Sequence, residues 1–289
     1  MNGILLIDKE PDWTSSDVVA KLRGVLHEKR IGHSGTLDPM ATGLLVVFVG
    51  RATRAAEFAG THDKRYLASL RLGTVTDTQD ITGNVIRTQP AVVSERRLRE
   101  VLESFRGEQL QIPPMYSAIK IRGRKLYEIA RSGGEVEREP RPIRINDISL
   151  AGCSGGDWLL DISCSKGTYV RTLCNDIGER LGCGGCMSAL RRVSAGPFSV
   201  DDALTIDEVR RAAGEGRAEK LLIGTDRLFE GTKKCTASSA IEKKIRCGAE
   251  IKTGLPDGEY RVYSGNGDFL MLGRVAGGTM KTVKSFFEV

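Results

Sequence analysis

The sequence predicts an α+β fold. Apolar residues recur at helical spacing in some segments and alternate with polar residues in others, without a regular strand–helix–strand repeat. Residues 65–72 (RYLASLRL) alternate strictly, which is typical of a half-buried strand and places Tyr66 on the core-facing side. Residues 15–29 instead carry Val18 and Leu22 on one helical face. The 289 residues, 40% of them hydrophobic, suffice for one large core and a smaller second one.

Short local signals predict the N-terminal elements. Residues 3–8 (GILLID) form an apolar run that indicates a strand. Thr14, with Asp17 three positions later, is typical of the residue that caps a helix. The apolar run 43–50 (GLLVVFVG) predicts a buried strand, and we expect a helix across residues 53–61.

The middle of the chain continues this mixture of helices, strands and loops. We expect a polar loop over 74–83, a helix over 94–106, a strand over 158–164, a helix over 170–181 and a helix over 205–212. The turn at 165–171 (SKGTYVR) suits either an anion site at a helix N-terminus or a plain capped turn.

Composition divides the chain into two domains. A linker near residues 227–234 separates a large domain over 1–230 from a short, strand-rich domain over 231–289. Residues 233–289 hold ten Lys/Arg against six Asp/Glu, a basic bias that fits a polyanionic partner. A stretch over about 108–145, rich in Pro, Lys and Arg, is expected to form a surface excursion of the large domain.

Aromatic and basic residues are interleaved in this excursion. Tyr116 and Tyr127 flank four Lys/Arg residues between positions 120 and 125. Such a mixture is typical of surfaces that touch phosphates and bases. A solvated basic hairpin followed by a helix has the same composition, so composition alone leaves both interpretations open.

Missing motifs remove support from several classes of enzyme. The chain has no Walker sequence, no GxGxxG after a strand, no GxSxG and no HExxH, which disfavours nucleotide hydrolysis, nicotinamide redox chemistry and zinc hydrolysis. Seven cysteines, an odd number, indicate reduced thiols, and Cys183-Gly-Gly-Cys186 has no second ligand pair to complete a zinc site. No signal peptide and no apolar run of roughly 18 residues is present, so we expect a cytoplasmic protein.

The glycine-rich stretch 31–45 presents one histidine and one carboxylate just before a buried strand, a setting in which folds often display reactive side chains. Asp38 precedes Pro39, which is the pattern of a helix cap followed by the first helical residue. The same carboxylate is equally suited to act as a nucleophile or a general base. His33 is expected in a loop. Taken alone, these residues leave the alternatives open.

Ordered motifs over residues 3–230 resemble one family closely. They are Ile7-Asp8-Lys9 with Ser15-Ser16, GHSGTLDPMATGLL, KRYLASLRLG with TDTQD, IPPMYSAIK with LYEIAR, CSKGTYVRTL and LGCGGCMSALRR. This set resembles the bacterial TruB-type tRNA pseudouridine synthases, which isomerise uridine 55 in the T loop of tRNA. The resemblance implies the pseudouridine synthase catalytic fold, a mixed and largely antiparallel sheet flanked by helices. It also implies a PUA-like C-terminal domain, which is short in this chain.

The resemblance implies a role for each matched polar residue. Asp38 is the catalytic nucleophile, which attacks either the sugar or the base ring. Arg171 matches the arginine that pairs with the catalytic carboxylate and keeps it ionised. Asp80 is expected to hold Arg171, and Lys9, in a matching N-terminal motif, is expected to have a supporting role.

The other matched residues handle the target uridine. Tyr66 matches the tyrosine that stacks on the base, Tyr169 matches a second aromatic that contacts the substrate, and Leu190 lines the base pocket. His33 matches the residue that wedges into the T loop as the nucleotide leaves the stack.

The resemblance also implies the partners. An isomerisation needs no cofactor and no metal, so neither is expected. We expect tRNA, read through its T-arm, as the partner of a monomer that needs no guide RNA, no obligate protein partner and no membrane. An RNA-binding or RNA-folding protein with little dependence on catalysis is the competing hypothesis.

Overall fold

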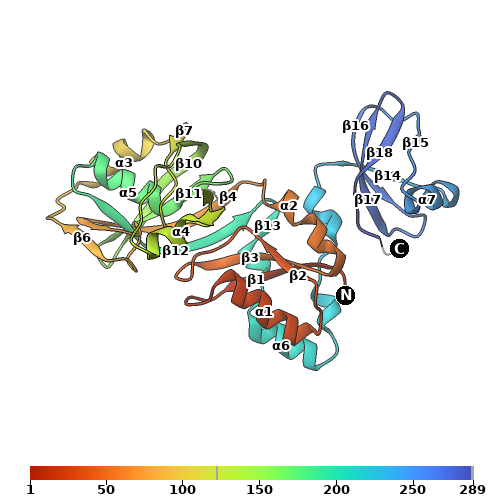
Figure 1. The fold of residues 1–289 in the computed structure, drawn as a ribbon, viewed down its shortest axis with the longest axis horizontal. Coiled ribbons are helices and arrows are strands. Elements are labelled where there is room, and N and C mark those ends of the chain that lie inside the picture. Colours follow the sequence, from red (N-terminus) through yellow and green to blue (C-terminus); the bar gives the residue numbers. More distant parts are fainter. Residues whose placement is uncertain (122, 288–289) are drawn as a thin grey trace. The chain divides into compact units, whose positions relative to one another are not determined.

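The structure of the protein is a computed structural model that describes residues 1–121 and 123–287, so Arg122 of the basic stretch lies outside the described residues. The chain divides into two compact units, whose elements Figure 1 labels. The first unit comprises Met1–Asp38, Leu44–Gly60 and Gly196–Val289, and the second comprises Pro39–Gly43 and Thr61–Ala195. No helix in the described part of the chain is both long enough and apolar enough to cross a membrane.

Three strands and two helices form the core of the first unit. β1 (Gly3–Lys9) and β2 (Ile31–Ser34) lie on either side of β3 (Thr42–Val49), and β2 runs antiparallel to β3. α1 (Ser15–Leu26) contacts α6 (Ile206–Gly214), as Figure 1 shows. The apolar side chains of α1 form one buried cluster with those of β1 and β3, as the helical spacing predicted.

The other elements between these strands and residue 230 are short. They are η1 (Gly50–Ala55), α2 (Ala56–Ala59), β13 (Phe198–Ser199), η2 (Val200–Asp202), η3 (Ala218–Leu221) and η4 (Thr225–Phe229). The helix predicted across residues 53–61 is therefore a 3-10 segment followed by one turn of α-helix.

The predicted cap of α1 is confirmed. The Asp17 N–H donates to Thr14 Oγ1 (3.0 Å), and the Thr14 N–H donates to Asp17 Oδ2 (2.9 Å). The hydrogen bond from the Thr14 side chain, followed by that from its backbone, lowers the pKa of Asp17. The helix ends at Leu26, before the predicted residue 29, because His27 adopts a left-handed conformation (φ 50°).

Residues 233–285 contain a separate five-stranded sheet in the order β14-β16-β17-β18-β15. Its strands are β14 (Lys233–Thr236), β15 (Ile251–Lys252), β16 (Gly258–Tyr263), β17 (Phe269–Ala276) and β18 (Thr279–Ser285). The strand pattern predicted for this part misses α7 (Ser239–Arg246), whose buried Ile245 joins the core of the sheet.

The second unit is built on one sheet with the strand order β12-β4-β11-β10-β7, in which all neighbours are antiparallel. These strands are β4 (Lys64–Leu72), β7 (Gly107–Gln111), β10 (Arg141–Ser154), β11 (Asp157–Cys164) and β12 (Gly185–Ala195). On the other side of β12, Thr42 and Gly43 pair with it in parallel. α3 (Glu95–Glu103) packs against β10, and α5 (Val170–Arg180) packs against β12. This mixed, largely antiparallel sheet with flanking helices confirms the predicted fold class.

The alternation predicted for β4 is also confirmed. Tyr66, Ala68 and Leu70 are all buried. A side chain added at Gly185 would crowd both Leu70 and the Cys174 carbonyl of α5. The Tyr66 face of the sheet is therefore the face that α5 covers.

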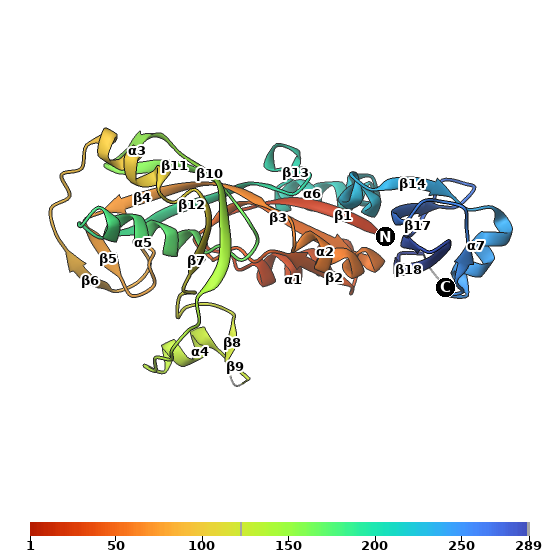
Figure 2. The same cartoon turned by 90° about the horizontal axis from the view of Figure 1, so that it is seen from above.

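Between β7 and β10 the chain leaves the sheet, and we call residues 112–140 the basic segment. It contains β8 (Lys120–Ile121), β9 (Arg124–Lys125) and α4 (Leu126–Arg131). Figure 2 shows these elements standing away from the sheet of the second unit. Residues 108–111 and 141–145, which the sequence assigned to the excursion, belong to strands of the sheet itself.

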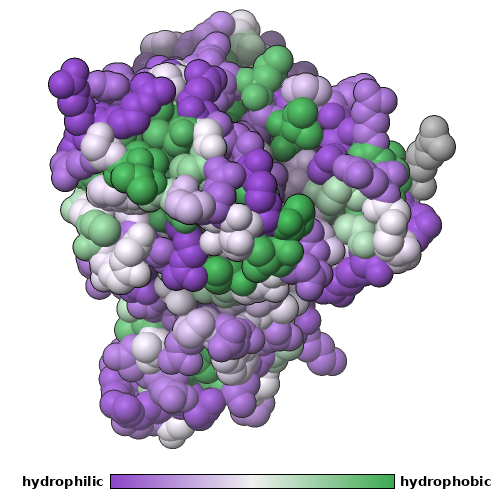
Figure 3. All heavy atoms as spheres, turned by 90° about the vertical axis from the view of Figure 1, so that its left-hand side faces the viewer, coloured by the Kyte–Doolittle hydropathy of each residue, from purple (hydrophilic) through white to green (hydrophobic). Residues whose placement is uncertain are grey.

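A small hairpin pairs β5 (Thr74–Thr76) with β6 (Val85–Thr88). The polar loop predicted over residues 74–83 therefore begins only after Thr76, because its first three residues form β5. Val85 and Ile86 on β6 and Leu110 on β7 are exposed. Figure 3 views the side on which β6 lies and shows hydrophobic residues interspersed among hydrophilic ones. These exposed apolar side chains belong to the hairpin and to an edge strand, outside the buried core.

The turn between α5 and β12 carries the two closely spaced cysteines. The N–H groups of Cys183 and Gly184 both donate to the Gly178 carbonyl, at 3.2 and 2.9 Å, and so close the helix. Burial raises the pKa of the Cys183 and Cys186 thiols. Within the described residues, no group of three His, Cys, Asp or Glu side chains is placed to hold a metal ion.

Candidate active site

A buried serine fixes the backbone just before Asp38. Ser15 Oγ, at the start of α1, accepts a hydrogen bond from the Leu37 N–H (2.9 Å) and donates one to the Leu37 carbonyl (3.1 Å). Ser15 and Leu37 are both buried, so water does not compete for these bonds. The main-chain conformation that leads into Asp38 is therefore well defined.

Asp38 lies in irregular backbone between β2 and β3. Residues 39 and 40 form a turn and β3 begins at Thr42, so the helix-cap alternative for Asp38 is wrong. At Gly43 (φ +94°), a Cβ would lie 2.3 Å from the Arg192 carbonyl. Only glycine permits this close pairing with β12, which ends the turn that carries Asp38.

His33 lies on β2, opposite Val47 of β3. The expectation that His33 lies in a loop is therefore wrong. The strand is only four residues long and contains a glycine, so it shows no alternation from which a strand could be predicted.

Lys9 fixes the turn between β1 and α1. Its buried ammonium donates to the carbonyls of Glu10 (2.9 Å) and Trp13 (2.7 Å). That turn leads directly to Ser15, which holds Leu37. Lys9 thus supports the start of the helix from which the Asp38 backbone is fixed.

In the second unit, Tyr66 and Leu190 lie on one face of the sheet. Tyr66 is opposite Arg192 and Ala68 is opposite Leu190 in the pairing of β4 with β12. Directly opposite residues of antiparallel strands share a face, so Tyr66 and Leu190 are diagonal neighbours. Both are buried, and Arg192 beside them is buried as well. Burial, followed by the Arg192 charge, lowers the pKa of Lys64 on the same strand as Tyr66.

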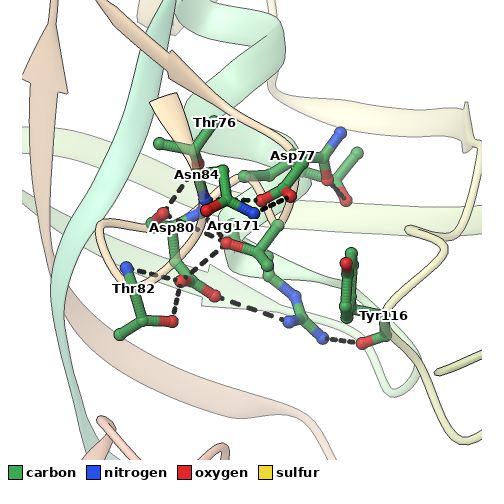
Figure 4. Close-up of polar contacts among 10 residues, drawn as sticks. Thr76, Asp77, Asp80, Thr82, Asn84, Tyr116 and Arg171 are labelled. Atoms are coloured by element: carbon green, nitrogen blue, oxygen red, sulfur yellow. Dashed lines mark hydrogen bonds and ion pairs between the residues drawn. The ribbon is translucent and has the colours of Figure 1, made fainter. Parts of the chain in front are cut away.

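Asp80 and Arg171 form a buried ion pair in this unit, as Figure 4 shows. Arg171 Nη1 lies 3.6 Å from Asp80 Oδ2, and the two side chains are only 7% and 5% exposed. Arg171 Nη2 donates a hydrogen bond to the Tyr116 carbonyl (2.7 Å). The guanidinium is thereby held between a carboxylate of the loop after β5 and the backbone of the basic segment.

Tyr169 belongs to the same cluster. Its N–H donates to Gln111 Oε1 (2.8 Å), and Gln111 Nε2 donates to its carbonyl (3.0 Å), so one buried glutamine of β7 fixes the residue before α5. The Arg171 guanidinium carbon lies 5.8 Å from the centroid of the Tyr169 ring, within reach of a cation–π interaction. The structure thus brings Tyr169, Arg171 and Asp80 together, whereas Asp38, His33 and Lys9 belong to the first unit.

Three residues that hold the cluster and the Asp38 backbone were not predicted to do so from the sequence. Ser15, Gln111 and the Tyr116 carbonyl contact partners that are 22, 58 and 55 positions away. No local pattern reveals contacts at such separations. The one signal present is that Ser15 and Tyr116 stand inside the motifs SS and IPPMYSAIK.

Two family models match the chain in succession. One is described as the TruB family pseudouridylate synthase N-terminal domain and matches residues 23–170. The other is described as the tRNA pseudouridylate synthase B C-terminal domain and matches residues 171–228. The chain belongs to the TruB family of pseudouridylate synthases. The resemblance inferred from the motifs, and with it the expectation of an enzyme of this class, is confirmed.

Relatives within the TruB family are similar over most of the chain. The tRNA pseudouridine synthase B of Clostridium kluyveri is 40% identical over 292 residues, which cover 99% of this chain and 100% of that protein. The proteins of the same name from Alkaliphilus oremlandii and Bacillus subtilis are 45% and 42% identical, over 87% and 88% of this chain and 83% and 84% of theirs.

Solved structures share the fold of this TruB family member. A chain of a crystal structure of a Cbf5–Nop10–Gar1 complex superposes with a TM-score of 0.75 at 25% identity, covering 99% of this chain and 85% of that one. A chain of an H/ACA RNP bound to a substrate RNA containing 2′-deoxyuridine gives a TM-score of 0.76 at 23% identity, with the same coverage. This likeness supports the pseudouridine synthase fold over the whole length of the chain.

Proposed function

We propose that this chain converts uridine 55 in the T loop of tRNA to pseudouridine, with Asp38 as the nucleophile. The observation that carries the proposal is the fixed backbone next to Asp38, in a chain that belongs to a family of pseudouridylate synthases. Asp38 follows a backbone fixed by Ser15 and precedes a turn at residues 39 and 40. Relatives that match the chain over nearly its whole length are named tRNA pseudouridine synthase B, which supports tRNA as the substrate.

The reaction breaks the bond between N1 of uracil and C1′ of ribose, and forms a bond between C5 and the same C1′. All atoms of the substrate are retained, so no co-substrate is consumed. Asp38 adds either to C1′, which displaces the uracil, or to the base ring, and both routes require an ionised carboxylate. Formation of the C5–C1′ bond is accompanied by cleavage of the bond to Asp38, which regenerates the free carboxylate. C5 loses its proton and N1 gains one, so the product is an isomer of the substrate.

The remaining site residues are proposed to bind and orient the uridine. Tyr66 and Leu190, neighbours on one sheet face, offer a flat aromatic and apolar surface for the flipped base. Tyr169 contacts the substrate, and His33 takes the place of the uridine in the T loop. Arg171, which is held by Asp80, is proposed to pair with the Asp38 carboxylate and keep it ionised.

We propose that the chain acts on tRNA without a guide RNA or an obligate protein partner, as a monomer in the cytoplasm. The cations of the basic segment and of the strand-rich part over residues 231–289 are proposed to contact phosphates, which supply most of the affinity of such complexes. We place the domain boundary between residues 230 and 231, because the strands that begin at Lys233 form a sheet of their own.

Asp38→Asn tests the role of the nucleophile, because the amide has nearly the shape of the carboxylate but cannot add to carbon. We expect pseudouridine formation in an unmodified tRNA transcript to fall on the order of 10³-fold or more, with the Kd for tRNA nearly unchanged. Asp12→Asn is the matched control, because Asp12 is exposed and asparagine also tolerates its left-handed φ of 65°. A turnover of Asp38→Asn close to that of the wild type would contradict the assignment. A wild-type protein that binds tRNA but forms no product would favour the competing RNA-binding hypothesis.

A further inference from the structure

Two threonine hydroxyls surround one oxygen of the Asp80 carboxylate. Asp80 Oδ1 accepts hydrogen bonds from Thr78 Oγ1 (2.9 Å), Thr82 Oγ1 (2.5 Å) and the Thr82 N–H (3.0 Å). Asp80 is 4% exposed, so these three donors take the place of water around Oδ1. The other oxygen, Oδ2, faces Arg171, as Figure 4 shows. These hydrogen bonds favour the orientation in which the other oxygen of the carboxylate is directed at the guanidinium.

The backbone on both sides of Asp80 is fixed independently of these threonines. The Met187 N–H donates to the Gln79 carbonyl (3.0 Å), and the Ile81 N–H donates to the Met187 carbonyl (2.9 Å). Thr172 Oγ1 of α5 donates to Gln79 Oε1 (2.6 Å). Gln79 has a φ of 65°, a conformation that a non-glycine residue keeps only where its surroundings impose it. Since β12 holds this backbone and α5 holds the Gln79 side chain, the side-chain torsions of Asp80 are what remains to be set.

The ion pair that Asp80 makes is sensitive to those torsions. The distance of 3.6 Å between Arg171 Nη1 and Asp80 Oδ2 is longer than a hydrogen bond, so a rotation of the carboxylate weakens the pair readily. Both groups are buried, where a misdirected charge is screened little by solvent. Arg171 is also bound to the Tyr116 carbonyl, so only one side of the guanidinium depends on Asp80.

We propose that Thr82, assisted by Thr78, is a positioning residue for the isomerisation. It orients the Asp80 carboxylate, and Asp80 in turn orients Arg171. The proposal rests on the proposed function, in which Arg171 pairs with the Asp38 carboxylate. Thr82 is itself exposed, so its hydroxyl can be removed with little loss of core packing.

The first test compares three variants of β5 and the loop that follows it. Thr82→Val keeps the shape and the backbone N–H but removes the hydroxyl, and Thr82→Ser keeps the hydroxyl. Thr76→Val is the matched control, because Thr76 Oγ1 donates to the Asp80 carbonyl (2.7 Å) and not to its carboxylate. That carbonyl retains the Gly83 N–H as a donor (3.3 Å).

Under single-turnover conditions we expect Thr82→Val to slow pseudouridine formation about tenfold, with an unchanged Kd for tRNA. Thr82→Ser should restore the rate to within about twofold, and Thr76→Val should stay near the wild type. Equal rates for Thr82→Val and the wild type, or an equal loss for Thr82→Val and Thr76→Val, would overturn the proposal.

A double-mutant cycle separates positioning from a general loss of structure. If Thr82 acts only through the Asp80 carboxylate, Thr82→Val should add less than about twofold to the defect of Asp80→Ala. Losses that multiply in the double variant would show that Thr82 acts by another route.

A measurement without substrate keeps the inference separate from the proposed function. Rotation about the Nε–Cζ bond of Arg171, followed by ¹⁵N NMR of the full chain, should be faster in Thr82→Val than in the wild type and in Thr76→Val. Unchanged rotation would overturn the positioning role even if the wild type is active on tRNA. Faster rotation in a protein that forms no pseudouridine would sustain the positioning role and refute the proposed function instead.

Discussion

The hydroxyl of Ser15 is the side-chain group that defines the backbone next to Asp38. It forms both a donor and an acceptor bond with Leu37 in a site closed to water. We expect Ser15→Ala to destabilise the protein by about 1–3 kcal/mol, because two buried backbone groups of Leu37 lose their partner. Denaturant unfolding measures this change. We also expect a lower single-turnover rate with little change in tRNA affinity, and an unaltered rate would show that the Asp38 backbone is fixed by other contacts.

The residue scale is also where prediction from the sequence reached its limit. The cap of α1 was predictable, because Thr14 and Asp17 are three positions apart and act on each other. The contacts of Ser15 with Leu37 and of Asp80 with Arg171 join distant segments, so they appear only when the chain is folded. The helix-cap alternative for Asp38 failed because Pro39 begins a turn here, although the same pair of residues also begins helices.

At the scale of elements, an ion pair joins β4 to β11. Arg71 Nε and Nη2 donate to the two carboxylate oxygens of Asp157, both at 2.9 Å, and Ser188 Oγ of β12 donates to Asp157 Oδ2 (2.5 Å). Burial alone would raise the pKa of Asp157, but the hydrogen bonds from Arg71 and Ser188 outweigh it and lower the pKa.

The stability from this pair should therefore depend on pH. A lowered folded-state pKa gives a contribution that is complete above the unfolded-state pKa of about 3.9 and is lost as the pH falls through the folded-state value. We expect Asp157→Asn to cost about 1 kcal/mol at neutral pH, since Arg71 is partly exposed and the attraction is screened. The cost should shrink below about pH 4. A cost that is the same at pH 3 and pH 7 would contradict this account.

The exposed cations of the basic segment lead to a separate prediction about RNA binding. Lys120 and Arg124 are exposed on β8 and β9. If both contact phosphates, the double variant Lys120→Gln/Arg124→Gln should reduce the slope of log K against log salt for tRNA binding by about 1.4–1.8. Arg96→Gln/Arg99→Gln on α3 removes the same charge outside the segment and should leave the slope nearly unchanged. Equal slopes for the two double variants would favour the alternative that the basic segment is a solvated hairpin and helix without phosphate contacts.

Element boundaries were predicted best where the pattern was long. β4 and α5 show several repeats of their period, and both lie where the sequence placed them. β2 has four residues and α7 lies in a tail that reads as strands, so the periodicity of neither was visible. The bounds predicted for the basic excursion were too wide. The Pro and Arg residues at the start of β10 are not typical of a strand, although β10 is paired on both sides.

At the scale of the whole molecule, Phe229 connects the C-terminal sheet to the rest of the first unit. Its ring lies 5.3 Å from that of Phe58 on α2 and 6.0 Å from that of Phe286 after β18. We expect Phe229→Ala to lower the free energy of unfolding by about 3–5 kcal/mol, because a buried aromatic is lost from the centre of this cluster. The Tm from calorimetry should fall accordingly, and a Tm within a degree of the wild type would show that the sheet is held by other contacts.

The central claim is that the protein isomerises uridine 55 of tRNA with Asp38 as the nucleophile. The most direct measurement therefore locates the pseudouridine in the product. The full-length protein is incubated in excess with an unmodified tRNA transcript, and every pseudouridine is mapped by mass spectrometry. The account predicts a single pseudouridine at position 55 with the wild type and none with Asp38→Asn. An unmodified uridine 55 after single-turnover incubation, or an equal product from Asp38→Asn, would contradict it.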